Sequence, residues 1–184
     1  MRQRIVIGLA MAAGLVLVAA AMAASSSREV EHNRPDQDQL QLEHHRAQAR
    51  RVYEEGLSRG IFEVPYTADF VGHGGVDFTH EQGLAEARGW RAAFPDLQVE
   101  VDRMVAEGDL VSVRWTARGT NTGAGNGLPA TGKRVQVSGV TMFRFVGGAI
   151  AEEWTAGNSL GLLRQLGLYP ASPMSSSSTA GATQ

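Results

Sequence analysis

Two titratable side chains, Glu152 and His73, have surroundings that suit general acid/base chemistry. Glu152 lies in a largely apolar segment, where burial would raise the pKa of its carboxyl toward neutrality and let it accept a proton. His73 lies in the glycine-rich run 70–75 (FVGHGG), and an imidazole with an ordinary pKa of about 6.5 suits a general base. The structural alternatives are a carboxylate satisfied by a backbone or arginine partner and a histidine in a turn. Glu152 and His73 are therefore the candidate catalytic residues.

A second group of side chains could hold a substrate beside Glu152. Asn158 can orient a carbonyl or hydroxyl group but has no titratable proton near neutral pH, and it could equally cap the leucine-rich segment that follows it. Three aromatic residues are large enough to serve either as core or as the wall of a ligand site. The candidate substrate-binding residues are Asn158, Trp154, Trp115, Phe143 and Thr141.

The sequence offers little support for a metal or a phosphate site. It has no cysteine, so only histidine and carboxylate ligands remain. His44 and His45 are neighbours in a helical segment and cannot converge on one ion, while His73 and His80 lack a third ligand at a recognisable spacing. The run 123–127 (GAGNG) lacks the lysine of a phosphate loop and predicts a turn. We expect no metal and no cofactor.

Composition limits the partners of the chain. With 184 residues there is room for one domain and extensions, and 43% hydrophobic residues suffice for a core. The net charge is −2 and the basic residues form no stripe, which argues against a nucleic-acid partner. The candidate partners are a small apolar or aromatic ligand and a second copy of the chain bound through the sheet.

The first residues are typical of an export signal. Arg2 and Arg4 precede an uncharged run, and residues 21–23 (AMA) fit a signal-peptidase site. We expect a signal peptide over residues 1–23, a polar linker over 24–39, a folded domain over 40–170 and a disordered tail over 171–184. The protein would then be exported, periplasmic or secreted. The alternative is an uncleaved segment that anchors it in the membrane.

Hydrophobic spacing predicts helices followed by strands. Apolar and small residues at helical spacing predict a helix that ends near Gly60, and Thr79 with Gln82 has the spacing of a capping box at the start of a second one. Alternation with a period of two predicts strands within residues 97–102, 111–118, 134–146 and 149–156. A last helix covers residues 160–166, with Gly167 at its C-cap. This order indicates an α+β fold with helices on one face of the sheet.

The last two strands are joined by a predicted two-residue turn, Gly147-Gly148, which fixes an expected register. If Val146 pairs with Ala149, strict alternation puts Glu152 opposite Phe143. One face would then carry the more apolar residues and meet the helices, whereas a shift of one residue would turn the last strand over. That face holds Val137, Thr141, Phe143, Glu152, Trp154 and Asn158, and the other holds Arg144 and Glu153 as a surface ion pair.

Several short runs occur in a characteristic order between residues 46 and 169, and together they resemble the SnoaL-like polyketide cyclases, also called ester cyclases. The resemblance implies the nuclear transport factor two-like fold: a cone-shaped, curved antiparallel sheet, closed by N-terminal helices around an apolar pocket. The runs are 94–97 (FPDL), 105–109 (VAEGD), 114–120 (RWTARGT), 137–139 (VSG), 143–145 (FRF) and 160–167 (LGLLRQLG).

In cyclases of this family an acidic residue four positions after a tryptophan acts as acid/base in an aldol ring closure that needs no cofactor. Here Trp154 is followed by Asn158 at that spacing, so the amide replaces the acid. Two functions follow. The first is a cofactor-free cyclase or isomerase of carbonyl-rich, polyketide-like substrates, in which a base abstracts an α-proton. The second is a non-catalytic small-molecule binding protein of the same fold.

Overall fold

A computed structural model of the chain describes residues 36–169. The chain divides into two compact units, residues 1–44 and 45–184, and the sheet lies wholly in the second. The proposed signal peptide and tail lie outside the described residues, while residues 36–39, assigned above to the linker, are helical. Within residues 36–169, no helix has the length and apolar character needed to span a membrane.

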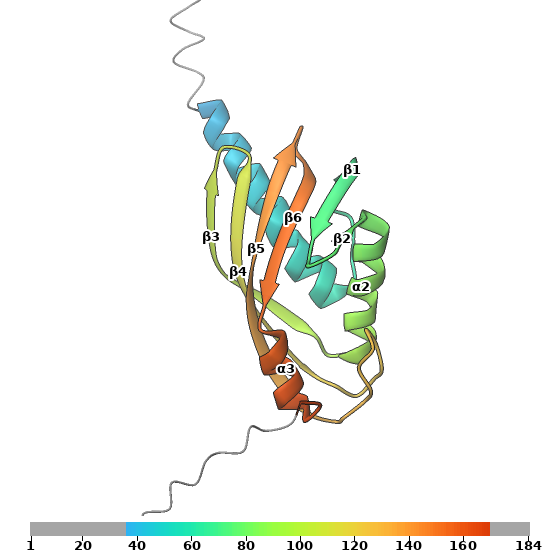
Figure 1. Ribbon diagram of the computed structural model, residues 1–184. Coiled ribbons are helices and arrows are strands. Elements are labelled where there is room, and N and C mark those ends of the chain that lie inside the picture. The colour runs from blue at the N-terminus through green and yellow to red at the C-terminus, as the bar shows by residue number, and fades with distance from the viewer. Residues whose placement is uncertain (1–35, 170–184) are drawn as a thin grey trace, which may run out of the picture. The chain divides into compact units, whose positions relative to one another are not determined.

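One open sheet of six strands forms the body of the second unit, in the order β2-β1-β6-β5-β4-β3 (Figure 1). Every neighbouring pair is antiparallel except β1 with β6, which run parallel. The sheet is therefore mixed, whereas a purely antiparallel sheet was expected. The strands are β1 (Tyr66–His73), β2 (Asp77–Phe78), β3 (Gln98–Glu107), β4 (Leu110–Thr120), β5 (Arg134–Val146) and β6 (Ala149–Gly157).

The helices pack against one face of this sheet, which we call the inner face. Residues 45–59 are helical and include a π-helical stretch, η1 (Val52–Leu57), which crosses behind the strands in Figure 1. The helix α2 (His80–Ala93) lies beside the β1 end of the sheet, and α3 (Ser159–Leu166) follows β6. The expected α+β arrangement, with helices on one side, is confirmed.

Local signals in the sequence fix the ends of these elements. Thr79 caps α2 in a capping box: its hydroxyl accepts from the Gln82 N–H while the Gln82 side chain accepts from the Thr79 N–H. Gly167 ends α3 in the left-handed conformation, with φ of 74°. Gly147 and Gly148 both have positive φ, 59° and 83°, as a tight hairpin between twisted strands requires. These predictions are confirmed.

The strands β1 and β2 were not predicted from the sequence. Their residues lack a clear alternation, and β1 departs from a regular register with β6 between Tyr66 and Val71. Only two residue pairs join β1 to β2. A strand held mainly by a partner about 80 residues later leaves no local pattern, because its pairing is decided by the tertiary fold.

The core lies between the inner face of β4 to β6 and the helical residues 45–59. Val111 and Val113 of β4, with Phe143 and Phe145 of β5, are fully or almost fully buried and alternate with exposed or half-buried neighbours. Their helical counterparts include Ala49 and Tyr53. This alternation is what positions inner-facing side chains along β5 and β6.

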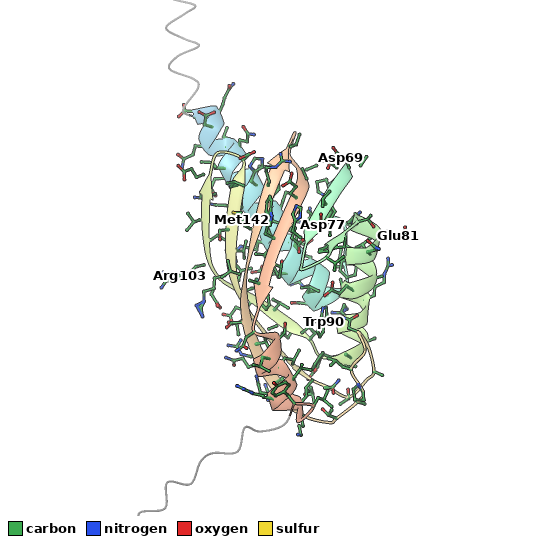
Figure 2. All side chains as sticks on the ribbon, viewed as in Figure 1. Asp69, Asp77, Glu81, Trp90, Arg103 and Met142 are labelled. Atoms are coloured by element: carbon green, nitrogen blue, oxygen red, sulfur yellow. The ribbon has the colours of Figure 1, made fainter. Side chains whose placement is uncertain are left out.

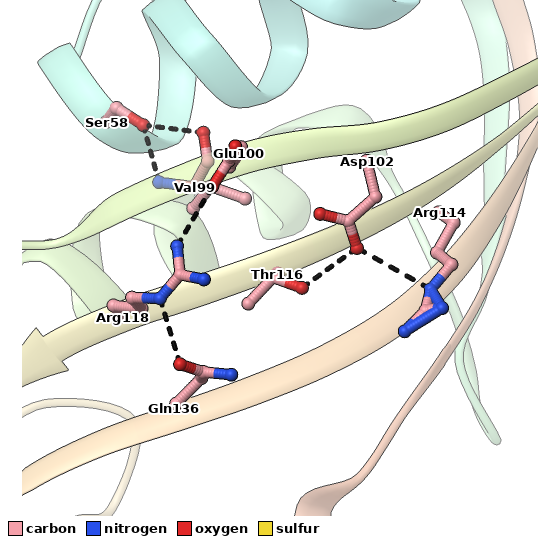
Figure 3. A network of polar contacts seen from close by, with 8 residues as sticks. All are labelled: Ser58, Val99, Glu100, Asp102, Arg114, Thr116, Arg118 and Gln136. Carbon is pink, nitrogen blue, oxygen red and sulfur yellow. Dashed lines mark hydrogen bonds and ion pairs between the residues drawn. The ribbon is translucent and has the colours of Figure 1, made fainter.

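The opposite, outer face of β3, β4 and β5 carries a network of polar contacts (Figure 3). Arg118 joins Glu100 on β3 to Gln136 on β5, at 3.0 and 2.9 Å. Asp102 accepts from the Thr116 hydroxyl at 2.9 Å and pairs with Arg114 at 3.5 Å. Such exposed pairs contribute little stability individually, so the outer face is a polar surface and not a second core.

Candidate functional site

A β-bulge in the last hairpin decides which glutamate reaches the inner face. Val146 pairs with Ala149 and Phe145 with Ile150, as predicted, but Arg144 pairs with Glu152, which leaves Ala151 as the extra residue on β6. Beyond the bulge the register is shifted by one, so Phe143 faces Glu153 and Thr141 faces Thr155. The predicted pairs of Phe143 with Glu152, Thr141 with Trp154 and Val137 with Asn158 are wrong for this reason.

Glu153 therefore lies on the inner face of the sheet. Its carboxyl accepts a hydrogen bond from the Thr155 hydroxyl at 3.0 Å. Thr155 lies 2.8 Å from the buried Thr141 hydroxyl, and the Trp115 indole N–H donates to Thr141 at 3.1 Å. Burial raises the pKa of Glu153, and the nearby Glu86 carboxylate acts in the same direction, whereas the bond from Thr155 opposes the rise. The balance of these effects favours the protonated form of Glu153 more than an exposed carboxyl would.

Two tyrosines complete the surroundings of Glu153. Burial, and secondarily the charge on Glu153, raise the pKa of Tyr53 and of Tyr66 far above the ordinary value, so both hydroxyls stay protonated at neutral pH. Tyr53 stacks on Trp115, with ring centroids 6.0 Å apart, and Tyr66 stacks on His80 at 4.1 Å. Burial also lowers the pKa of His80, which favours its neutral form. The group therefore combines one acid with neutral polar and aromatic side chains.

This part of the inner face is incompletely covered. Phe143 and Thr141 are fully buried, but Trp115, Tyr66 and Glu153 remain half-buried and Thr155 is exposed. A wholly structural carboxylate would be expected to have an arginine partner or full exposure. Glu153 has neither, since the contact that its carboxyl makes within residues 36–169 is the bond from a hydroxyl.

The two predicted catalytic residues come together on the outer face. Glu152 accepts from Arg144 in an ion pair, in place of the predicted pair between Arg144 and Glu153. His73 lies 3.9 Å from Glu152 through Nε2 and 2.9 Å from Asp77 through Nδ1. Figure 2 shows Asp77 at the β2 end of the sheet. The prediction that Glu152 shares a face with Thr141 and Phe143 is wrong, because the bulge turns β6 over.

The predicted ligand-binding residues divide between the two faces. Trp115, Phe143 and Thr141 lie together on the inner face beside Glu153. Trp154 lies on the outer face opposite Met142 and stacks on His73, with centroids 5.0 Å apart. Its predicted place on the inner face is therefore wrong. A role for Trp154 in ligand binding at the inner face has no geometric support.

Asn158 acts as the N-cap of α3. Its side-chain oxygen accepts from the Gly161 N–H at 2.8 Å, and its own N–H donates to the Ser138 carbonyl at 3.2 Å. The residue is exposed and lies past the end of β6. Of the two roles considered from sequence, capping is the one that the hydrogen bonds show.

The sequence pattern assigned Glu153 to a surface ion pair with Arg144 and did not identify Tyr53 or Tyr66 as site residues. One signal was available for Glu153. Residues 149–151 (AIA) are three small or apolar residues in a row, which breaks the two-residue period and is compatible with a bulge before Glu152. Within residues 36–169 no group of three or more histidine and acidic side chains could hold a metal ion.

Comparison with known proteins places this geometry in a class. Residues 45–166 match the family described as SnoaL-like polyketide cyclase. Among solved structures, AclR from Streptomyces galilaeus, a candidate hydroxylase, is 31% identical over 72% of this chain and 86% of its own, with a TM-score of 0.64. IdmH from Streptomyces antibioticus, a candidate polyketide cyclase, is 28% identical over 67% of this chain and 98% of its own, with a TM-score of 0.59.

A candidate SnoaL-like polyketide cyclase from Jannaschia sp. CCS1 is 25% identical over 69% of this chain and 94% of its own, with a TM-score of 0.61. None of the curated proteins compared with the sequence matches it significantly. The fold is thus the nuclear transport factor two-like α+β class, with an open sheet. The chain belongs to the SnoaL-like polyketide cyclase family.

Proposed function

We propose that the protein is a cofactor-free cyclase or isomerase in which Glu153 abstracts a proton from the carbon next to a carbonyl. The observation that carries this proposal is the position of Glu153: an inner-facing carboxyl with a raised pKa that has no arginine partner among residues 36–169 and lies near Tyr53 and Tyr66. A base of this kind works best when its pKa lies near the working pH. Family membership and the aromatic surroundings support a carbonyl-rich, partly aromatic substrate.

The neighbouring groups would support the negative charge that develops on the substrate oxygen. Tyr53 and Tyr66 keep their protons at neutral pH, and a neutral hydroxyl can donate a hydrogen bond to an enolate. After ring closure or isomerisation, the protonated Glu153 returns its proton to carbon or oxygen. The proton taken from the substrate is thereby conserved, and no oxidant or metal enters the balance.

A second candidate function is a non-catalytic, exported binding protein. It is favoured by one observation, the capping role of Asn158, which stands where the family carries its acid/base. In that case the inner face would bind a small aromatic ligand, and Glu153 would only select for hydrogen-bond donors. Export itself remains a proposal that rests on the first 23 residues.

A single proton-exchange assay distinguishes the two functions. The probe is an aromatic β-keto ester in D2O, and loss of its α-proton signal in the NMR spectrum measures proton abstraction. We expect the wild-type chain to accelerate exchange and Glu153→Gln to lower the rate by about 10² or more. Glu152→Gln is the matched control, because it removes the adjacent carboxyl on the outer face.

Three outcomes are informative. Exchange at the wild-type rate in Glu153→Gln would overturn the assignment of the base. Saturable binding of the probe by every variant, without exchange above the buffer rate, would overturn catalysis and support the binding protein. The double variant of Glu152 and His73 is expected to retain exchange, because both side chains lie on the outer face.

A further inference from the structure

Four inner-face residues form an unbroken chain of hydrogen bonds that ends at Glu153. The Trp115 indole N–H lies 3.1 Å from the Thr141 hydroxyl oxygen. The Thr141 and Thr155 oxygens are 2.8 Å apart, and the Thr155 oxygen lies 3.0 Å from the Glu153 carboxyl. These hydrogen bonds cross three strands, from Trp115 on β4 through Thr141 on β5 to Thr155 and Glu153 on β6.

The chemistry of its first member gives this chain a direction. An indole N–H can only donate, so Thr141 must accept from Trp115 and can use its own proton elsewhere. The carboxylate of Glu153 can only accept, so Thr155 must donate to it. Thr155 has a single proton, which leaves Thr141 as the donor between the two hydroxyls. Every proton in the chain then points toward Glu153.

The surrounding structure holds Trp115 in place. Its ring lies over Gly139, where any side chain would overlap it, and within van der Waals distance of a side chain placed at Gly157. Tyr53 stacks on this ring, with centroids 6.0 Å apart, and its hydroxyl interacts with both Thr141 and Trp115. Thr141 is fully buried, so water does not compete for its hydroxyl. The donor at the start of the chain is therefore fixed by the two glycines and Tyr53.

We infer that Trp115 is a positioning residue that acts through Thr141 and Thr155 to keep the Thr155 hydroxyl directed at the Glu153 carboxylate. This sets the strength of Glu153 as a base, and it deepens the proposed function without needing a substrate. A hydrogen bond donated to the charged form favours that form. The hydrogen bond from Thr155 therefore favours the charged form of Glu153, which burial disfavours.

Other charged and titratable groups face Glu153 from the elements packed against it. They are Tyr53 of η1, Tyr66 of β1 and Glu86 of α2. Both tyrosines are neutral over the range in which a carboxyl titrates, and Glu86 raises the pKa of Glu153. Among these groups, the hydrogen bond from Thr155 is the one that lowers the pKa of Glu153.

The test is a direct titration of Glu153 in the full chain, labelled with 13C at glutamate side-chain carboxyls. Glu153→Gln assigns the signal. We expect Thr155→Val to raise the pKa of Glu153 by about one unit, a tenfold change in its proton affinity, and Thr155→Ser to restore the wild-type value. Trp115→Phe keeps an aromatic ring, although a smaller one, removes the donor, and should raise the pKa of Glu153 by a smaller amount.

Thr141→Val provides a second route if Trp115→Phe fails to fold. It breaks the chain between Trp115 and Thr155 while both stay in place, and should raise the pKa of Glu153 as Trp115→Phe does. The double variant of Trp115→Phe and Thr141→Val should raise the pKa of Glu153 no further than the larger of the two single changes, because both break the same series of hydrogen bonds. An unchanged Glu153 pKa in folded Thr141→Val would overturn the inference. If the variants shift the pKa of Glu153 as expected but the wild-type protein accelerates proton exchange on no probe, only the proposed function is overturned.

Discussion

Glu152 and Glu153 are neighbours in sequence and lie on opposite faces of the sheet. Glu152 accepts from Arg144 on the outer face, and Glu153 accepts from Thr155 on the inner face. The same residue type therefore has two environments: Glu152 is ion-paired on the outer face, and Glu153 is half-buried on the inner face near aromatic side chains. The pair offers matched variants for separating chemistry from stability.

The first prediction concerns stability against pH. The folded-state pKa of Glu153 is raised by burial, so its contribution to stability is full below the unfolded pKa and falls as the pH rises through the folded pKa. Glu153→Gln has no carboxyl at this position, so it does not lose this stability as the pH rises. We expect the free energy of unfolding of Glu153→Gln, relative to wild type, to increase as the pH rises from about 4 to 8, measured by urea denaturation.

Glu152→Gln is the control for this series. Its carboxyl is ion-paired with Arg144 on the outer face, and loss of such a pair costs little, so the variant should be slightly less stable than wild type and should gain no relative stability as the pH rises. If the free energy of unfolding relative to wild type rose with pH in both variants, the assignment of Glu152 and Glu153 to opposite faces would be contradicted.

The second prediction concerns Asn158. Loss of its cap in Asn158→Ala should cost about 0.5–2 kcal/mol of unfolding free energy, whereas Asn158→Asp should keep the cap. Urea denaturation measures both. Neither variant should change the affinity for an aromatic ligand, because the side chain is exposed at the start of α3. Weaker binding by Asn158→Ala at unchanged stability would return Asn158 to the ligand site.

The third prediction concerns the glycine under Trp115. A methyl group at position 139 would overlap the Trp115 ring and come within 2.7 Å of the Ala156 carbonyl. Overpacking of this kind costs about 1–3 kcal/mol. We expect Gly139→Ala to lower the melting temperature and to change tryptophan fluorescence. Ser138→Ala, one residue away on the other face, should do neither; equal effects would refute the close packing.

The fourth prediction concerns the N-terminus. Mass spectrometry of the protein from a native host should find Ala24 as the first residue, in the periplasmic or extracellular fraction. Recovery of the full-length chain in the membrane fraction would instead establish the anchored alternative.

Much of the fold is predictable from sequence because its signals are local. The Thr79 cap, the Gly147-Gly148 turn and Gly167 each depend on a few adjacent residues, and each is confirmed. The short β1–β2 edge is different, since β1 finds its main partner far along the chain. Periodicity cannot report a pairing that only the tertiary fold creates.

The candidate site was harder to predict for a related reason. Trp115, Thr141 and Phe143 were assigned to the same face, and the structure places them together. Glu152 and Trp154 were assigned to that face by strict alternation, which a single extra residue at Ala151 reverses. A bulge carries little sequence signature, yet it moves every residue beyond it to the other side of the sheet.

The parallel pairing of β1 with β6 has a consequence for how the chain matures. His73 of β1 lies beside Trp154 of β6, so the β1 edge of the sheet cannot be completed until the last strand has emerged from the ribosome. A long loop must close before this contact forms, which slows folding. Until β6 has been synthesised, β1 therefore lacks its main pairing partner, although β3, β4 and β5 can already pair with one another.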